Sequence, residues 1–487
     1  MSKSYSTPVS LPDAGLDRDE VFRRMAAVRD KDTRWRDGRT FSLVFYAGEE
    51  MLSVLKEAYT MFFSENGLNP GAFPSLKKFE SEVLSMTAGL LGGDSNTAGN
   101  MTSGGTESIL MAVKTARQKF RAERPDITEP EILVPVTAHP AFDKAGHYFD
   151  VKIRHMPVAQ DYRADVNAMR DAITERTIMI VGSAPQYPQG VVDPIAELAE
   201  LAAARGILMH VDACVGGMML PFVRKLGFDV PDFDFKLPGV TSMSVDLHKY
   251  GYAAKGASCV LYRDKDLRRH QYFVYTEWPG GIYASPTVAG TRPGGAIAAA
   301  WAIMNYLGEE GYLGITRTVM ETVRTVAEGV REMDGVKILG EPHMSVMCLA
   351  ADDPSLDIYE VGDEMSVRGW HLDRQQYPAS LHLTINWAHS QSVEQFLSDL
   401  REAIAKARRF SLSKLNSQMG VLAGSALGVL PESMASGITR MFSKMGGSGL
   451  PKRSAAMYGM MGKLPNRGDL QDVVKDLLDK FTDAAKK

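Results

Sequence analysis

The chain has 487 residues, of which 45% are apolar and 23% are charged, so it can bury a large core and does not have the composition of a disordered or fibrous protein. Its net charge of −4 at pH 7 disfavours a nucleic-acid-binding protein. No apolar run approaches the ~20 residues of a spanning helix, and the polar start lacks the apolar stretch of a signal peptide, so we expect a soluble cytoplasmic protein.

We expect an N-terminal arm over residues 1–75, followed by a large α/β domain over residues 76–305. From about residue 105 to 262, β-rich runs alternate with helical patterns, which predicts a mostly parallel sheet covered by helices. The predicted strands are Ile132–Thr137, Val151–Met156, Thr177–Ser183, Ile207–Ala213, Val240–Val245 and Ser258–Tyr262. The clearest predicted helices are Thr106–Arg121 and Pro194–Ala204, the second with Asp193 as N-cap and proline at the first helical position.

A smaller α+β domain is expected over residues 306–410. Its predicted helices are Thr316–Met333, Ile358–Gly369 and Val393–Ala407, and its predicted strands are Val336–Leu339, Val346–Ala350 and Leu381–Asn386. The three cysteines, Cys214, Cys259 and Cys348, have no pair spacing typical of a disulfide framework or a metal site, so we expect buried free thiols.

The last segment of the chain is basic. Residues 401–487 contain 15 Lys and Arg against 7 Asp and Glu, a net charge of +8, which leaves −12 on residues 1–400. This contrast favours contact of a basic tail, residues 411–487, with a phosphorylated substrate or a lipid surface. A solvated tail that balances an acidic body has the same composition. Peripheral membrane attachment and export to a host are both compatible with it.

A lysine follows a predicted strand in the motif Ser244-Val-Asp-Leu-His-Lys-Tyr-Gly251. Ligands of α/β folds bind at the carboxyl ends of parallel strands, where Lys249 is expected to lie. A lysine attacks an aldehyde only as the free amine, and we expect His248 and Lys255 to supply the neighbouring cations that favour this form. On this motif alone, an ordinary surface lysine is the alternative.

A carboxylate ends another predicted strand in the motif His210-Val-Asp-Ala-Cys-Val-Gly-Gly217. A carboxylate buried at a strand end needs a cationic partner, and a protonated pyridine nitrogen would serve. Such a pair makes the ring an electron sink for a carbanion. The alternative is that Asp212 caps the following turn.

Two further features complete the pattern. The motif Thr102-Ser-Gly-Gly-Thr-Glu-Ser108 opens a long helix, whose free N–H groups and positive dipole end could bind a phosphate. His139 follows the strand Ile132–Thr137, where its ring could stack on a cofactor. A well-capped helix and a structural histidine are the alternatives. Because all four features occur at strand ends or helix starts, we predict that Lys249 holds pyridoxal 5′-phosphate (PLP) as a Schiff base and that Asp212 pairs with its ring nitrogen.

At these motifs the sequence resembles the fold-type I PLP enzymes, in their group II decarboxylase branch, and within it the sphingosine-1-phosphate lyase family. The resemblance covers roughly residues 40–410. Its matched blocks begin at Met101, His210, Gly239 and His248. The longest is Trp278-Pro-Gly-Gly-Ile-Tyr-Ala-Ser-Pro-Thr-Val-Ala-Gly-Thr-Arg-Pro-Gly-Gly295, and the match resumes at Ala456-Met-Tyr-Gly-Met460. It implies a homodimer with shared active sites and no metal.

The resemblance also implies roles for individual residues. The cofactor would be held by Gly104, Gly105, Thr106, His139, Asp212, His248 and Lys249, with Gly290 and Thr291 from the other subunit. The substrate phosphate would contact Tyr46, Lys255 and Asn69, with Tyr458 covering the site. Lys255 is the leading acid/base residue, with Tyr46 and Lys249 as alternatives. In one departure, the chain reads Asn66-Gly-Leu-Asn-Pro70 where the family typically has a histidine at the position of Asn69, so charge assistance to the phosphate is lost.

The implied reaction is the retro-aldol cleavage of sphingosine 1-phosphate, or another phosphorylated long-chain base, to a fatty aldehyde and phosphoethanolamine. A PLP-dependent L-amino-acid decarboxylase is the first alternative, because it needs the same electron sink. A non-catalytic lipid or protein adaptor is the second.

Overall fold

The computed structural model describes residues 10–408 and the isolated positions 455, 458, 471, 474, 475, 478 and 479. The Gly-, Ser- and Met-rich stretch 416–449 and most of the predicted basic tail therefore lie outside the described residues. Among the described residues, no helix is both long enough and apolar enough to cross a membrane.

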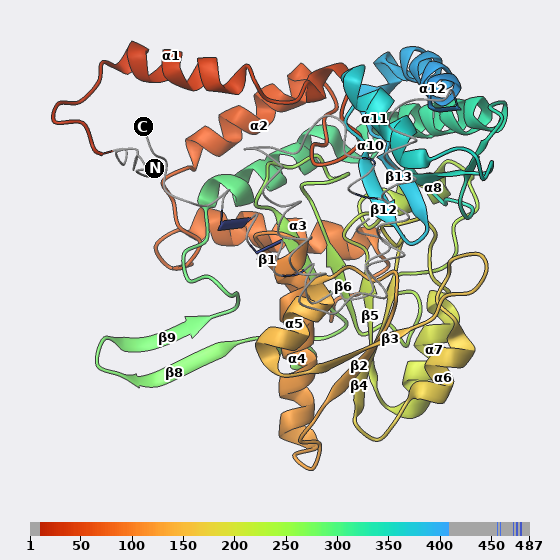
Figure 1. The fold of residues 1–487 in the computed structure, drawn as a ribbon. Helices are drawn as coiled ribbons and strands as arrows, with labels where there is room; N and C mark the ends of the chain where they lie inside the picture. Colours follow the sequence, from red (N-terminus) through yellow and green to blue (C-terminus); the bar gives the residue numbers. More distant parts are fainter. Residues whose placement is uncertain are drawn as a thin grey trace, which may run out of the picture.

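Within this described part, seven strands form a central sheet in the order β1-β7-β6-β5-β4-β2-β3 (Figure 1). Neighbouring strands from β3 to β6 pair in parallel, and β7 is antiparallel to both of its neighbours. The strands are β1 (Ala98–Thr102), β2 (Glu131–Pro135), β3 (Lys152–Met156), β4 (Thr177–Ser183), β5 (Leu208–Asp212), β6 (Ser242–Val245) and β7 (Ser258–Tyr262). The mostly parallel sheet expected from the sequence is confirmed, although β1 was not predicted.

Helices cover both faces of this sheet, which explains why its inner strands are apolar rather than alternating. Helices α4 (Gly105–Glu123) and α5 (Ala141–Phe149) lie on one face, and α6 (Val166–Ala172) and α7 (Ile195–Arg205) lie on the other (Figure 1). Each face has its own apolar cluster, with Phe142 in one and Leu198 in the other. Because the strands from β3 to β6 run parallel, their carboxyl ends lie at one edge of the sheet. The loops that follow these strands therefore lie close together.

One local prediction about α7 is wrong. Pro194, and not Asp193, is the N-cap, and no side chain caps this helix. The buried Asp193 carboxylate instead accepts hydrogen bonds from the backbone N–H of Ser183 (2.7 Å) and Ala164 (2.8 Å). Asp193 therefore stabilises the end of β4 and does not cap α7.

A second, antiparallel sheet follows in the order β10-β11-β13-β12. Its strands are β10 (Val336–Ile338), β11 (Val346–Ala351), β12 (Asp373–Gln376) and β13 (Ala379–Thr384), and it is accompanied by α11 (Ile358–Val367), η2 (Trp387–Gln391) and α12 (Val393–Arg408). Helix α10 (Gly294–Arg331) connects the two sheets and is interrupted by non-helical dihedral angles at Gly308. The predicted domain boundary at residues 305/306 falls inside this helix, close to the interruption, and the domain division stays a prediction.

Two parts of the chain extend from the core. The hairpin formed by β8 (Phe273–Trp278) and β9 (Gly281–Ser285) projects far from the body (Figure 1). The N-terminal helix α1 (Arg18–Arg29) has no buried residue, whereas α2 (Glu49–Met61) and α3 (Pro74–Leu90), which follow η1 (Trp35–Asp37), pack against α10. The remaining short helices are α8 (Leu220–Lys225) and α9 (Lys265–Arg269).

Candidate active site

The loops that follow β2, β4, β5 and β6 surround a cavity of 540 Å³ together with the start of α4. This volume lies in the range of ~300–1,000 Å³ that is usual for small-molecule sites. Among the described residues, the cavity is lined by Ser103, Gly104, Gly105, Thr106, Glu107, Ile109, His139, Ser183, Pro185, Tyr187, Asp212, Cys214, Val215, Asp246, His248, Lys249, Lys255 and Gly256. The four features that the sequence predicted to meet thus lie around one space.

The turn before α4 brings backbone into the cavity. Gly104 is the N-cap, and no side chain caps the helix, so the first N–H groups of α4 keep the capacity to bind an anion. A Cβ atom at Gly105 would lie 2.8 Å from both Asp246 Oδ2 and Cys214 Sγ. Only glycine therefore fits between the turn and these side chains.

Asp212 ends β5 and is almost fully buried, with 8% of its surface exposed. Its Oδ1 accepts hydrogen bonds from the backbone N–H of Cys214 (3.1 Å) and from the hydroxyl of Ser244 (3.2 Å). No described residue is seen to donate to Oδ2. Asp212 thus caps the following turn with one oxygen, as the alternative reading expected, and the second oxygen remains for a cation in the cavity.

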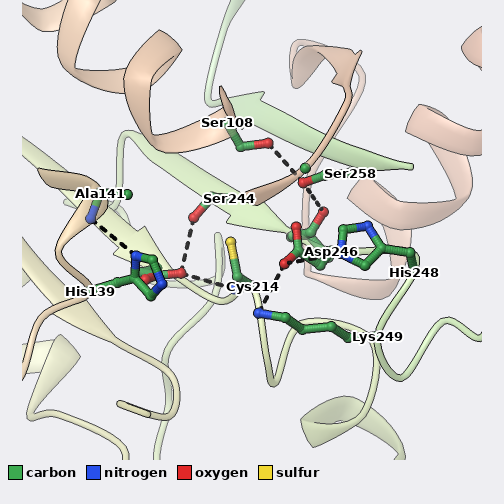
Figure 2. A network of polar contacts seen from close by, with 12 residues as sticks. Ser108, His139, Ala141, Cys214, Ser244, Asp246, His248, Lys249 and Ser258 are labelled. Atoms are coloured by element: carbon green, nitrogen blue, oxygen red, sulfur yellow. Dashed lines mark hydrogen bonds and ion pairs between the residues drawn. The ribbon is translucent and has the colours of Figure 1, made fainter. Parts of the chain in front are cut away.

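Lys249 is paired with a residue that sequence reasoning did not select. Its Nζ lies 3.0 Å from Asp246 Oδ2 (Figure 2). Burial acts to lower the pKa of Lys249, but the charge of Asp246 outweighs it and the pKa is raised above the ordinary value. The expectation that His248 and Lys255 leave this lysine as a free amine is therefore wrong for the cofactor-free protein, because the nearest charge is negative.

Asp246 is itself buried, with 2% of its surface exposed. Burial acts to raise its pKa, but the charges of Lys249 and then His248 hold the pKa below the ordinary value. Its Oδ1 is buried without a hydrogen-bond partner among the described residues. This carboxylate is ionised at neutral pH and keeps one oxygen available beside the cavity.

Lys255 borders the cavity on the same side as His248, and its Nζ lies 3.4 Å from the His248 carbonyl oxygen. The residue as a whole is accessible to solvent, but protein atoms surround its amine. This burial lowers the pKa of Lys255 to about 8, and the charge of Lys249 acts in the same direction. Solvent access moderates such a shift. The direction of this shift agrees with the role of Lys255 as an acid/base residue that was expected from the sequence.

The two histidines of the cavity have different environments. His139 Nδ1 accepts a hydrogen bond from the backbone N–H of Ala141 (3.1 Å), which fixes the ring at the cavity rim (Figure 2). His248 Nδ1 donates to the carbonyl oxygen of Ala257 (2.8 Å), and burial lowers the pKa of this histidine. His248 is therefore a neutral ring beside the start of α4.

The residues around the cavity fit PLP. The free N–H groups at the start of α4 suit its phosphate, and the available oxygen of Asp212 suits its protonated ring nitrogen. The glycine at position 105 leaves room that a Cβ atom would fill. Lys249 lines the same cavity, where it would supply the amine that the aldehyde requires.

Other predicted residues lie outside this cavity. Tyr46 lines a second hollow of 320 Å³, which also contacts His248 and Lys255. Its hydroxyl donates to Glu49 Oε1 at 3.0 Å, and burial, followed by this hydrogen bond, raises the pKa of Tyr46.

Asn69 and Thr291 take part in local contacts elsewhere. Asn69 is exposed, and its Oδ1 accepts hydrogen bonds from the backbone N–H of Gly71 and Ala72. Thr291 borders a small hollow of 40 Å³ next to Ser103, and its neighbour Gly290 lies near the Tyr283 hydroxyl.

Tyr458 packs against the second sheet's helix, with ring centroids 5.8 Å apart from Tyr359 and with the Arg374 guanidinium 5.3 Å from its ring. A single copy of the chain therefore does not bring Asn69, Gly290, Thr291 or Tyr458 to the cavity. Their assigned roles stay predictions. The three cysteines are buried free thiols, as expected.

Asp246 and Tyr187 are among the cavity residues that sequence reasoning did not select. Asp246 follows β6 directly, just as Asp212 ends β5, so the strand-end argument applied to Asp212 could have found it. Tyr187 lies in the loop after β4 and contacts the second sheet through Asp373. No sequence signal relates Tyr187 to Asp373, because the two residues are far apart in the chain.

Comparison with known proteins gives consistent matches. Residues 4–351 match the family model of the pyridoxal-dependent decarboxylase conserved domain. A sphingosine-1-phosphate lyase of Arabidopsis thaliana is 43% identical over 98% of this chain and 82% of its own length. The solved structure of a Burkholderia pseudomallei sphingosine-1-phosphate lyase has a TM-score of 0.79 and 39% identity, and covers 82% of this chain and 93% of the other. A probable L-aspartate decarboxylase of Pyrococcus abyssi is 34% identical over 81% of this chain and 99% of its own length.

Proposed function

The chain belongs to the pyridoxal-dependent decarboxylase family and, within it, to the sphingosine-1-phosphate lyases, and from this premise we propose that it cleaves sphingosine 1-phosphate, or another phosphorylated long-chain base, to a fatty aldehyde and phosphoethanolamine. The observation that supports this proposal most directly is that Lys249, Asp212 and the start of α4 line one cavity. A non-catalytic adaptor would not need a lysine, a buried aspartate and an anion-binding turn around one cavity.

The cofactor would be held by residues at four strand ends. Gly104, Gly105, Thr106 and His248 would bind the phosphate, Asp212 would pair with the ring nitrogen, and His139 would stack on the ring. PLP, when bound through Lys249, supplies an electron sink for the pair released by the breaking carbon–carbon bond. Asp212 keeps the ring nitrogen protonated, because removing its cationic partner would leave a buried, uncompensated carboxylate.

Lys255 would move the proton of the substrate hydroxyl. A general base works best when its pKa lies near the operating pH, and burial brings the pKa of Lys255 to about 8. Lys255 also borders the hollow that contains Tyr46. Tyr46 would meet the substrate phosphate there by turning its hydroxyl proton away from Glu49.

A homodimer would complete the site. The β8–β9 hairpin exposes Phe273, Val274, Trp278 and Ile282, and an exposed apolar surface of this kind is typical of an interface. Helix α1 has an apolar face, Val21, Met25 and Val28, that is exposed to solvent in a single copy of the chain. A second copy packed on these extensions would bury them and could contribute Asn69, Gly290, Thr291 and Tyr458. Membrane contact through the basic tail stays a prediction.

Product analysis tests the function directly. The purified protein with PLP should release aldehyde, and not carbon dioxide, from sphingosine 1-phosphate, and should turn over unphosphorylated sphingosine far more slowly. Carbon dioxide released from an amino acid, without aldehyde, would support the decarboxylase alternative. Asn69→His should strengthen the preference for the phosphorylated substrate, because it restores charge assistance.

Borohydride reduction tests the cofactor linkage. Peptide mapping after reduction should find the pyridoxyl label on Lys249. The Lys255→Met variant should carry the same label, whereas label found only at another lysine would overturn the assignment.

A further inference from the structure

Tyr187 brings the second sheet into contact with the cavity. It lies in the loop after β4, the strand next to β5, and lines the cavity together with Asp212. Its hydroxyl donates to Asp373 Oδ2 at 3.0 Å, and Asp373 is the first residue of β12 in the other sheet. A residue of the second sheet thus fixes the position of Tyr187, which lines the cavity.

The ring of Tyr187 also contacts the second sheet. It stacks on the buried His382 of β13, with centroids 3.9 Å apart and planes 20° apart. Gln375 Nε2, which can only donate, lies 3.1 Å from His382 Nδ1, so the ring proton is on Nε2 and points to the Thr384 hydroxyl (2.8 Å). His382 is therefore a neutral, fixed platform for the tyrosine.

The loop that contains Tyr187 is fixed by hydrogen bonds and by close packing. Gln375 also donates to the Pro188 carbonyl oxygen (3.0 Å), and Gln186 and Gln189 hydrogen-bond to each other in a buried position (2.8 Å). At Gly190, which has φ +74°, a Cβ atom would lie 2.0 Å from the Val346 carbonyl oxygen. The loop therefore packs closely against β11, and the position of the Tyr187 hydroxyl depends on the second sheet.

The contact with Asp373 fixes what the Tyr187 hydroxyl can do. Burial, and then the charge of Asp373, raises the pKa of Tyr187, so the phenol stays protonated. Its single proton is used by Asp373. The phenolic oxygen can then only accept a hydrogen bond from a group in the cavity.

Lys255, the proposed base, can accept from the substrate hydroxyl only as a neutral amine. While Lys255 is protonated, the hydroxyl needs another acceptor in the cavity. Glu107 accepts from the backbone N–H groups of Ser103 and Val288, and Asp212 would be engaged with the cofactor. Asp246 pairs with Lys249 through Oδ2, and its Oδ1, unpartnered among the described residues, lies against the glycine turn, where a Cβ atom at Gly105 would be 3.0 Å away. The hydroxyls of Ser103 and Thr106 belong to the turn proposed for the cofactor phosphate.

We propose that Tyr187, oriented by Asp373, accepts a hydrogen bond from the hydroxyl next to the amine-bearing carbon of the substrate, and that Asp373 is a positioning residue for this contact. The inference rests on the proposed function and adds a specificity determinant to it. The second sheet thereby takes part in distinguishing a hydroxylated amine from one without the hydroxyl.

The experiment compares two ligands in the PLP-loaded protein. One is sphingosine 1-phosphate, for which kcat/KM is measured. The other is its analogue without that hydroxyl, which cannot be cleaved and whose Kd is measured from the change in cofactor absorbance. Tyr187→Phe and Asp373→Leu should each lower kcat/KM roughly tenfold or more, as expected for loss of a hydrogen bond to an oriented group. The Kd of the analogue should change less than about twofold, since it never makes this contact.

Matched variants separate positioning from a structural defect. The double variant should lose no more activity than either single variant, because Asp373 acts through Tyr187. Asp373→Asn should keep most of the activity, since its amide oxygen still accepts from the phenol. His371→Gln should match the unaltered protein, because His371 lies 3.5 Å from the other oxygen of Asp373 and is exposed.

The outcomes are distinguishable. Equal losses for both ligands, no loss for either, or additive losses in the double variant would each overturn the inference while aldehyde release by the unaltered protein keeps the proposed function. Absence of aldehyde from the unaltered protein would overturn the proposed function, and the inference with it. Melting temperatures of all variants verify that the fold is retained.

Discussion

The partly exposed Lys249 and the buried Asp246 form an ion pair, with Nζ 3.0 Å from Oδ2, in the loop between β6 and β7. The pair faces the glycine turn of α4, since a Cβ atom at Gly105 would lie 2.8 Å from the same carboxylate oxygen. Before the cofactor binds, this pair keeps the lysine protonated. Reaction with an aldehyde therefore requires the amine to release a proton that Asp246 stabilises.

The first prediction concerns this ion pair. Asp246→Asn removes the negative charge next to Lys249 and should lower the pKa of the lysine, so PLP uptake should occur at lower pH than in the unaltered protein. A shift of about one pH unit or more is expected, which corresponds to ~1.4 kcal/mol. The rate of PLP uptake by the apoprotein, measured against pH, tests this. Asp143→Asn, which removes the partner of the exposed His155, is the control for loss of one charge. An unshifted profile would contradict the prediction.

The second prediction concerns Lys255. If this residue is the general base, the activity should rise with pH around its pKa of about 8, because the amine must be neutral to accept a proton. Lys255→Met should reduce kcat strongly and remove this rising limb. Both kcat and kcat/KM should be measured from below to above that pH. Unchanged turnover with an unchanged pH profile would show that another group takes the proton.

The third prediction concerns the space at Gly105. Gly105→Ala should weaken PLP binding at least about tenfold, or ~1.4 kcal/mol, because the added methyl group would clash with Asp246 and Cys214. Gly89→Ala is the matched control, since it lies within α3 and its Cβ atom would meet nothing within 4 Å. Equilibrium titration with PLP provides the measurement, and equal affinity in both variants would refute the steric argument.

The fourth prediction concerns stability in acid. Burial lowers the pKa of His210, His382 and His389 to about 4 each, from an ordinary value of 6.5. Between these values the unfolded chain binds more protons than the folded protein, so stability should be full above pH 6.5 and should fall as the pH decreases toward 4. Each group contributes at most ~1.4 kcal/mol per pH unit.

Melting temperatures from pH 7 to pH 4 test this dependence. His389→Gln should weaken the pH dependence, even if it lowers stability at pH 7, because one titrating group is gone. His155→Gln, which alters an exposed histidine, should leave the dependence as it is. A melting temperature that stays constant down to pH 4 would contradict the prediction.

The sequence was sufficient for the elements whose signals are local. The apolar runs of β4 and β7 predict both strands within their observed bounds, because a sheet covered on two faces makes its strands apolar throughout. The glycine turn before α4 and the residues that end β5 and follow β6 likewise predict a shared site, since parallel strands end at one edge. The family, the cofactor and the reaction followed from motifs that lie in these same places.

The tertiary structure alone decided the charges and contacts between distant segments. Asp193 looks like an N-cap in the sequence, but it binds backbone N–H groups that folding brings next to it. Lys249 was expected among cations, yet the nearest buried charge is Asp246, and its effect depends on a distance that sequence spacing does not give. The contact between Tyr187 and Asp373 joins two sheets across 186 residues of chain. A pKa or a hydrogen bond depends on distance and burial in three dimensions, and residue order does not specify either one.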